Sequence, residues 1–106
     1  MSMQAKQAIR EFVQRAQSLY GERLRQVLVY GSCARNEATE ESDIDLAVVL
    51  AGDVRPGREI DRMIDIITDI NLEYGVLLSV YPVSEEDYLH ANSPLLINLR
   101  REGIPA

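Results

Sequence analysis

The segment Asp43–Leu50 (DIDLAVVL) constrains the fold more than any other part of this chain. It begins with alternating acidic and apolar residues and ends as an unbroken apolar run. An unbroken run is typical of a central strand covered on both faces, and the alternation indicates that the first end of the strand is open. The segment therefore predicts a helix-covered sheet whose central strand carries two carboxylates at its open end.

The first part of the chain supplies one helix and one strand for such a sheet. Apolar residues recur at intervals of three and four through Met3–Tyr20, which predicts a helix that ends at Gly21. Leu24–Tyr30 is short and rich in β-branched residues, which predicts a strand. The polar, turn-rich run that follows it leads into Asp43–Leu50.

The second part of the chain predicts another strand and more helices. The apolar spacing through Ile60–Tyr74 indicates one helix, and Val76–Val83 resembles the first strand in composition. Ser84 and Ser93 are favourable residues to begin two further helices. We therefore expect an α/β fold of the α+β type, in which a small mixed sheet of three to four strands packs with helices.

Length and composition limit the class of protein. The 106 residues predict one domain spanning residues 1–106, because a typical domain has roughly 150 residues. A single cysteine, Cys33, excludes an internal disulfide framework and a zinc site built from several thiolates, which favours the cytoplasm. No apolar run approaches the roughly 20 residues of a membrane span.

The charges are unevenly distributed within a net charge of −6. Residues 1–35 carry six basic and two acidic side chains, whereas residues 36–106 carry five basic and fifteen acidic ones. Direct binding of nucleic acid is not expected, because the chain offers no broad basic surface for phosphates.

The candidate chemistry lies between Gly31 and Asp45. Side chains two apart in a strand share a face, so Asp43 and Asp45 present two carboxylates together. Such oxygen ligands suit Mg²⁺, which proteins usually hold with one or two carboxylates plus substrate phosphates. Gly31 and Ser32 follow a predicted strand, where glycine lets the backbone approach a phosphate.

The string GSCAR, followed by SDIDLAVVL, resembles the minimal nucleotidyltransferase family of the DNA polymerase β-like superfamily. The resemblance implies that Gly31, Ser32 and Arg35 bind a nucleoside triphosphate such as ATP. It also implies that Asp43 and Asp45 are catalytic and hold two Mg²⁺ ions.

The same resemblance implies a reaction and a partner. Relatives act as antitoxins and transfer AMP from ATP to a tyrosine hydroxyl of a HEPN toxin, a helical protein encoded nearby. The alternative is a binding module of the same fold that neutralises its partner without catalysis. A chain of this length leaves little room for an acceptor-binding domain, which favours an acceptor supplied by a second protein.

One position departs from the superfamily pattern. Ser79 stands where we align the third carboxylate, and a hydroxyl is a poor metal ligand and a poor proton acceptor. Three outcomes are open: a slowed enzyme, a domain that binds without catalysing, or replacement by another acid. The candidate replacements are Glu73, Glu85 and Glu86.

The remaining polar and apolar candidates have structural explanations. Cys33 and His90 lack the partners of a catalytic cysteine or histidine. The apolar run Pro94–Leu99 is a candidate surface for a homo-oligomer or a partner. Four arginines are interpreted as solvated, with a partner-binding face as the alternative: Arg10, Arg15, Arg23 and Arg25.

Overall fold

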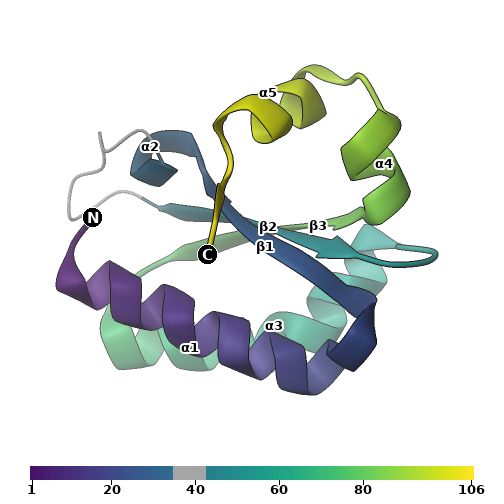
Figure 1. Ribbon diagram of the computed structural model, residues 1–106. Coiled ribbons are helices and arrows are strands. Elements are labelled where there is room, and N and C mark those ends of the chain that lie inside the picture. Colours follow the sequence, from purple (N-terminus) through teal and green to yellow (C-terminus); the bar gives the residue numbers. More distant parts are fainter. Residues whose placement is uncertain (35–42) are drawn as a thin grey trace.

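The computed structural model describes residues 1–34 and 43–106 and contains a four-stranded sheet flanked by helices (Figure 1). The strands are β1 (Leu24–Tyr30), β2 (Ile44–Leu50), β3 (Leu78–Ser84) and β4 (Ile104–Pro105). The helices are α1 (Met3–Tyr20), α2 (Gly31–Ala34), α3 (Pro56–Tyr74), α4 (Glu85–His90) and α5 (Pro94–Glu102), with a 3₁₀ turn, η1, at Gly21–Arg23.

The sheet is mixed, in the order β3-β2-β1-β4. Strand β2 runs antiparallel to β1 and parallel to β3, and β4 pairs antiparallel with β1. Strand β2 is thus internal, as its apolar run predicts, and six of its seven residues are buried. The predicted fold class is confirmed, while the two-residue strand β4 was not anticipated because it is too short to show a period.

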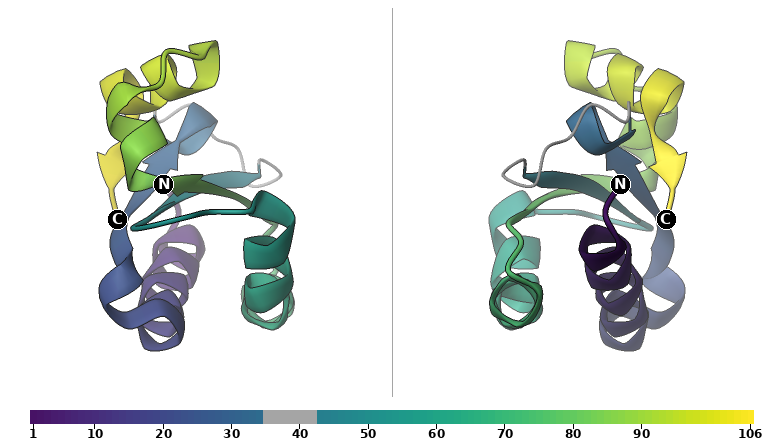
Figure 2. Two further views of the ribbon diagram at one scale, coloured as in Figure 1. Left: turned by 90° about the vertical axis from the view of Figure 1, so that its right-hand side faces the viewer. Right: turned by 90° about the vertical axis from the view of Figure 1, so that its left-hand side faces the viewer.

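Each face of the sheet has its own apolar core. Helices α1 and α3 cover one face, and α4 and α5 cover the other (Figure 2). Alternate residues of β2 explain the division, since Leu46 and Val48 belong to the α1/α3 core while Ala47 and Val49 belong to the α4/α5 core.

Short polar side chains begin several helices where the sequence predicts. Each of the serines Ser2, Ser84 and Ser93 accepts a hydrogen bond, through its hydroxyl, from the backbone N–H group of the residue three positions later. Helix α3 ends at Gly75, which adopts a left-handed conformation with φ of 62°. In residues 1–34 and 43–106 no helix is both long and apolar enough to cross a membrane.

The apolar run Pro94–Leu99 is divided between the core and the surface. Leu96 and Leu99 are 5% and 1% exposed and pack under α5 against the sheet, whereas Leu95 and Ile97 are each 39% exposed. The helical period thus divides the run: Leu96 and Leu99 face the sheet, while Leu95 and Ile97 stay exposed, so the use of this helix as a surface for a partner or a second copy stays a prediction.

Candidate active site

The two candidate carboxylates lie at one end of β2. Asp43 directly precedes the strand and is exposed, and Asp45 lies within it and is half-buried. Strand alternation places both residues on the face that Ala47 shares with α4 and α5. Tyr30, the last residue of β1, is the register partner of Asp45, so the chain enters α2 beside the carboxylates.

Gly31 and Asp45 are in close contact. A Cβ atom added to Gly31 would lie 2.3 Å from Oδ2 of Asp45. Gly31 also has φ of 70°, a backbone angle that residues with a side chain rarely adopt. Only glycine at this position leaves room for the carboxylate at its present place. The structure therefore brings Gly31 and Asp45 together, and Ser32, which is half-buried, follows Gly31 in α2.

The other side of Asp45 is occupied by Ser79. Ser79 of β3 is in register with Asp45, so Tyr30, Asp45 and Ser79 form one row across three strands. Side chains in such a row have Cβ atoms about 5 Å apart, within reach of a shared ligand. A carboxylate at position 79 would stand beside Asp45, but the exposed residue there has only a hydroxyl.

The three acids considered as replacements lie elsewhere. Ser84 pairs with Leu50, and Glu85 and Glu86 follow it, so both lie near the opposite end of β2, about 17 Å from Asp45 at the usual rise per residue. Glu85 pairs with Arg25 at 3.7 Å. Glu73 belongs to α3, where burial and the neighbouring carboxylate of Glu11 on α1 raise its pKa. These positions do not support the replacement of the missing carboxylate.

Two tyrosines near Asp45 were missed in the sequence. Burial raises the pKa of the Tyr30 phenol, and the charges of Asp45 and Tyr81 raise it further. Tyr81 lies two residues after Ser79, and both tyrosines pack against the α4/α5 core. The period of two in β3 could have placed Tyr81 on the carboxylate face, but the pairing of Tyr30 with Asp45 requires the antiparallel register.

The donor set is compatible with an ion that also binds substrate phosphates. Within residues 1–34 and 43–106, no group of three His, Cys, Asp or Glu side chains is arranged to hold a metal ion. Asp43 and Asp45 alone supply hard oxygen ligands, as Mg²⁺ sites completed by a nucleotide require. Arg35, predicted to lie near the nucleotide, and the side chain of Cys33 lie outside what the structure describes.

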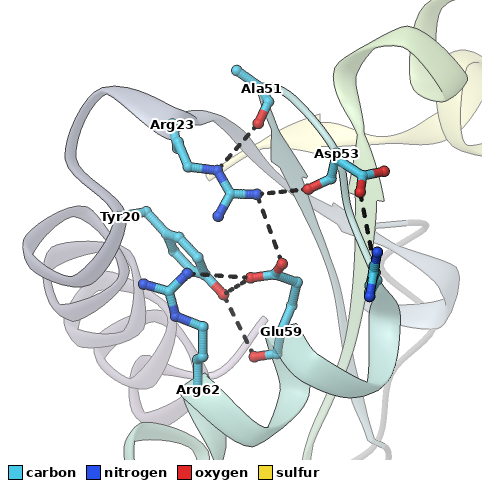
Figure 3. Close-up of polar contacts among 7 residues, drawn as sticks. Tyr20, Arg23, Ala51, Asp53, Glu59 and Arg62 are labelled. Carbon is cyan, nitrogen blue, oxygen red and sulfur yellow. Dashed lines mark hydrogen bonds and ion pairs between the residues drawn. The ribbon is translucent and has the colours of Figure 1, made fainter.

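A second polar cluster lies at the other end of the sheet (Figure 3). Glu59 of α3 is 2% exposed, and its carboxylate accepts a 3.0 Å hydrogen bond from the Tyr20 hydroxyl. Arg23 and Arg62 approach the same carboxylate at 3.7 and 3.8 Å. Arg23 also donates hydrogen bonds to the carbonyl oxygens of Ala51 and Asp53.

This cluster changes the interpretation of the arginines. Arg23 joins η1, α3 and the loop after β2, so its interpretation as a solvated residue is wrong. Arg15 is half-buried and pairs with Asp69. Arg25 is exposed and pairs with Glu85. Arg15 and Arg25 thus have partners outside this cluster, and the cluster lies at the Leu50 end of β2, away from Asp45, because Arg23 bonds to Ala51.

The sequence matches the nucleotidyltransferase domain family over residues 9–101. It is 42% identical over 84 residues to MJ0604, a proposed protein adenylyltransferase of Methanocaldococcus jannaschii, covering 79% of this chain and 78% of that protein. The solved structure of a proposed minimal nucleotidyltransferase is 31% identical, with a TM-score of 0.62, over 100% of this chain and 97% of the other.

This chain is similar, in its fold alone, to a crystal structure of a toxin–antitoxin complex with AMP-PNP. It is 14% identical, with a TM-score of 0.62, and the match covers 89% of this chain and 68% of the other. The matched span and the two sequence relatives show that this chain belongs to the nucleotidyltransferase domain family.

Proposed function

We propose that this protein transfers AMP from ATP to a hydroxyl group of a partner protein, in a Mg²⁺-dependent reaction, and thereby acts as an antitoxin in the cytoplasm. The observation that supports the proposal is the contact between Gly31 and Asp45, since a turn suited to phosphate lies beside a carboxylate that would hold Mg²⁺. Residues 1–106 would form one transferase unit.

The chemistry is an in-line displacement. The acceptor oxygen attacks the α-phosphorus of ATP, a new P–O bond forms, and the bond to the bridging oxygen breaks to release pyrophosphate. The hydroxyl proton passes to solvent, because the third carboxylate position is Ser79. Bound Mg²⁺ would neutralise phosphate charge, held by Asp43 and Asp45. Gly31 and Ser32 would contact the triphosphate, with Arg35 nearby.

The acceptor proposed is a tyrosine of a HEPN toxin encoded nearby. Two solved neighbours of this fold are toxin–antitoxin complexes, one with AMP-PNP and one named MntA-HpeT. The curated relative MJ0604 is a proposed protein adenylyltransferase. Both lines support a protein acceptor that arrives as a separate chain.

The test is transfer of radioactive AMP from labelled ATP to the helical protein encoded beside this gene. We expect labelling that requires Mg²⁺ and falls by roughly 100-fold or more in Asp45→Asn, because a neutral amide is a poor ligand for the metal. Asp53→Asn, at an exposed loop position, is the matched control and should label normally. Equal labelling by Asp45→Asn and the unchanged protein would reject the proposal.

A second candidate function is neutralisation by binding alone, favoured by the hydroxyl at Ser79. In that case the Asp45→Asn variant would still suppress the toxicity of the partner in cells. Loss of both labelling and protection in this variant would favour transfer over simple binding.

A further inference from the structure

We infer that the outer flank of α1 is a docking groove for an acidic, amphipathic segment of a partner protein. The groove, called here the α1 groove, has a volume of about 410 Å³ between α1 and the β1/β4 edge of the sheet. Its walls include Lys6, Ile9, Arg10, Val13, Val29 and Ile104. The inference deepens the proposed function, since it identifies where the acceptor protein is held.

The short strand β4 forms one wall of the groove. Its two residues pair only with Leu28 and Val29, so β4 leaves the beginning of β1 uncovered at this edge. A second hollow of about 180 Å³ lies along that uncovered part and shares Val13 and Pro105 with the first. The two hollows are therefore adjacent, and together they border α1 from Lys6 to Gln17.

The lining of the α1 groove is mainly apolar. Ile9, Val13 and Val29 line it from α1 and the sheet, and Ile104 at its edge is 49% exposed. Apolar side chains gathered in a concave surface indicate a site of protein interaction more often than scattered exposed ones do. The lining therefore suits apolar side chains of a docked segment.

The charges at the edge define the occupant. Lys6 and Arg10 are one helical turn apart on α1, and no Asp or Glu side chain of the described residues lines either hollow. Among the ion pairs of the described residues, neither Lys6 nor Arg10 takes part, whereas Arg15, Arg23 and Arg25 all do. In a chain of net charge −6, two unpaired cations at an apolar groove favour a segment with carboxylates beside its apolar row.

A second copy of this chain fits the groove less well. The acidic exposed face of α3 includes Asp61 and Asp65, and α3 lies beside α1 in the same layer of helices (Figure 2). An α3 face seated in the α1 groove of another copy would make a head-to-tail contact, which repeats without closing unless a ring forms. A separate partner protein avoids this problem.

The groove also lies near the candidate active site along the chain. Val29, in its wall, is two residues before Gly31. Val29 pairs with Leu46, next to Asp45, but faces the α1/α3 core, so a segment held in the groove would keep its protein near the Asp45 end of the sheet on the opposite face.

The test measures binding of two labelled helical peptides by fluorescence anisotropy. Both have a row of Leu, flanked by two Glu four residues apart in the acidic peptide and by two Lys in the basic one. We expect the acidic peptide to bind at least about tenfold more tightly than the basic one. In Lys6→Glu/Arg10→Glu this preference should reverse.

Two controls separate the groove from general charge effects. Arg58→Glu/Arg101→Glu makes the same charge change at exposed positions of α3 and α5 and should leave the acidic peptide bound. Ile104→Ser, which adds no charge, should weaken it through loss of the apolar wall. Equal binding of both peptides, or no effect of Lys6→Glu/Arg10→Glu, overturns the inference.

Sedimentation velocity tests the other occupant. Dimers or longer assemblies of the unchanged protein that dissociate in Lys6→Glu/Arg10→Glu would assign the groove to a second copy and overturn the inference. This test is independent of the proposed transfer of AMP, because peptide binding is measured without ATP. Selective binding without any AMP labelling would leave the groove in place and reject the proposed reaction.

Discussion

Gly31 touches the carboxylate of Asp45 so closely that a methyl group on Gly31 would lie 2.3 Å from Oδ2. The contact joins the turn after β1 to the first residues of β2, two segments that the sequence separates by more than a dozen positions. The antiparallel pairing of Tyr30 with Asp45 brings them together. The backbone and the carboxylate therefore form one unit that a side chain at position 31 would disrupt.

Replacing Gly31 should damage activity more than stability. Gly31→Ala forces a left-handed backbone, at a cost of roughly 1–2 kcal/mol, and also displaces the Asp45 carboxylate. Gly52→Ala carries the same backbone cost at φ of 83°, where a Cβ meets nothing within 4 Å. Urea unfolding should give similar losses for both variants, while AMP labelling should fall only in Gly31→Ala. Normal labelling by Gly31→Ala would show that the contact is dispensable.

A carboxylate at position 79 should raise the rate of transfer. Ser79 is exposed and in register with Asp45, so Ser79→Asp adds a third oxygen ligand and a proton acceptor without disturbing the core. General base catalysis typically contributes about 10²–10⁴-fold, and a gain of about tenfold or more is expected here. Thr68→Asp, an exposed position on α3, adds the same charge elsewhere and should change nothing. A slower Ser79→Asp enzyme would mean that the hydroxyl has a role of its own.

The sequence predicts this fold well because its periods are strong. The helix over Met3–Tyr20 and the strand over Leu24–Tyr30 have the predicted bounds, since Gly21 and Gly31 interrupt both patterns. Helix α3 begins at Pro56, before its first apolar residue Ile60, because proline is favoured at a first helical position.

The surroundings of the candidate site could not be predicted in the same way. Strand alternation places Asp43 and Asp45 on one face, but it does not show which strands lie beside them. Tyr30 lies beside Asp45 because β1 pairs antiparallel with β2, and Ser79 lies beside it because β3 pairs parallel with β2. The buried Glu59 was also missed, because its partners Tyr20 and Arg23 lie about forty residues away and a lone glutamate in a helix is usually exposed.

The Tyr20–Glu59 hydrogen bond should stabilise the fold in a pH-dependent way. Burial first, and then the Glu59 carboxylate, raise the pKa of Tyr20 from 10.0 to about 12. A raised pKa in the folded state means that the contribution is complete below pH 10 and is lost as the pH rises toward 12. Tyr20→Phe should cost about 1.5–3 kcal/mol near neutral pH, as for hydrogen bonds to charged groups.

The measurement is urea unfolding of the unchanged protein and Tyr20→Phe at several pH values from 7 upward. The gap in unfolding free energy between them should narrow above pH 10. Tyr88→Phe, a partly buried tyrosine on the other face of the sheet, controls for the loss of a hydroxyl. A gap that stays constant with pH would show that the Tyr20 pKa is not raised by folding.

Helix α5 should contribute to stability through one side. Leu99 is 1% exposed and Leu95 is 39% exposed on the same helix, so equal truncations test the two sides. Leu99→Ala should lower the unfolding free energy by about 2–5 kcal/mol, as buried leucines do, and Leu95→Ala should cost well under half of that. Urea unfolding at neutral pH measures both. Equal losses would mean that Leu95 is also buried in solution, against a second copy or a partner, and would support the outer face of α5 as an interaction surface.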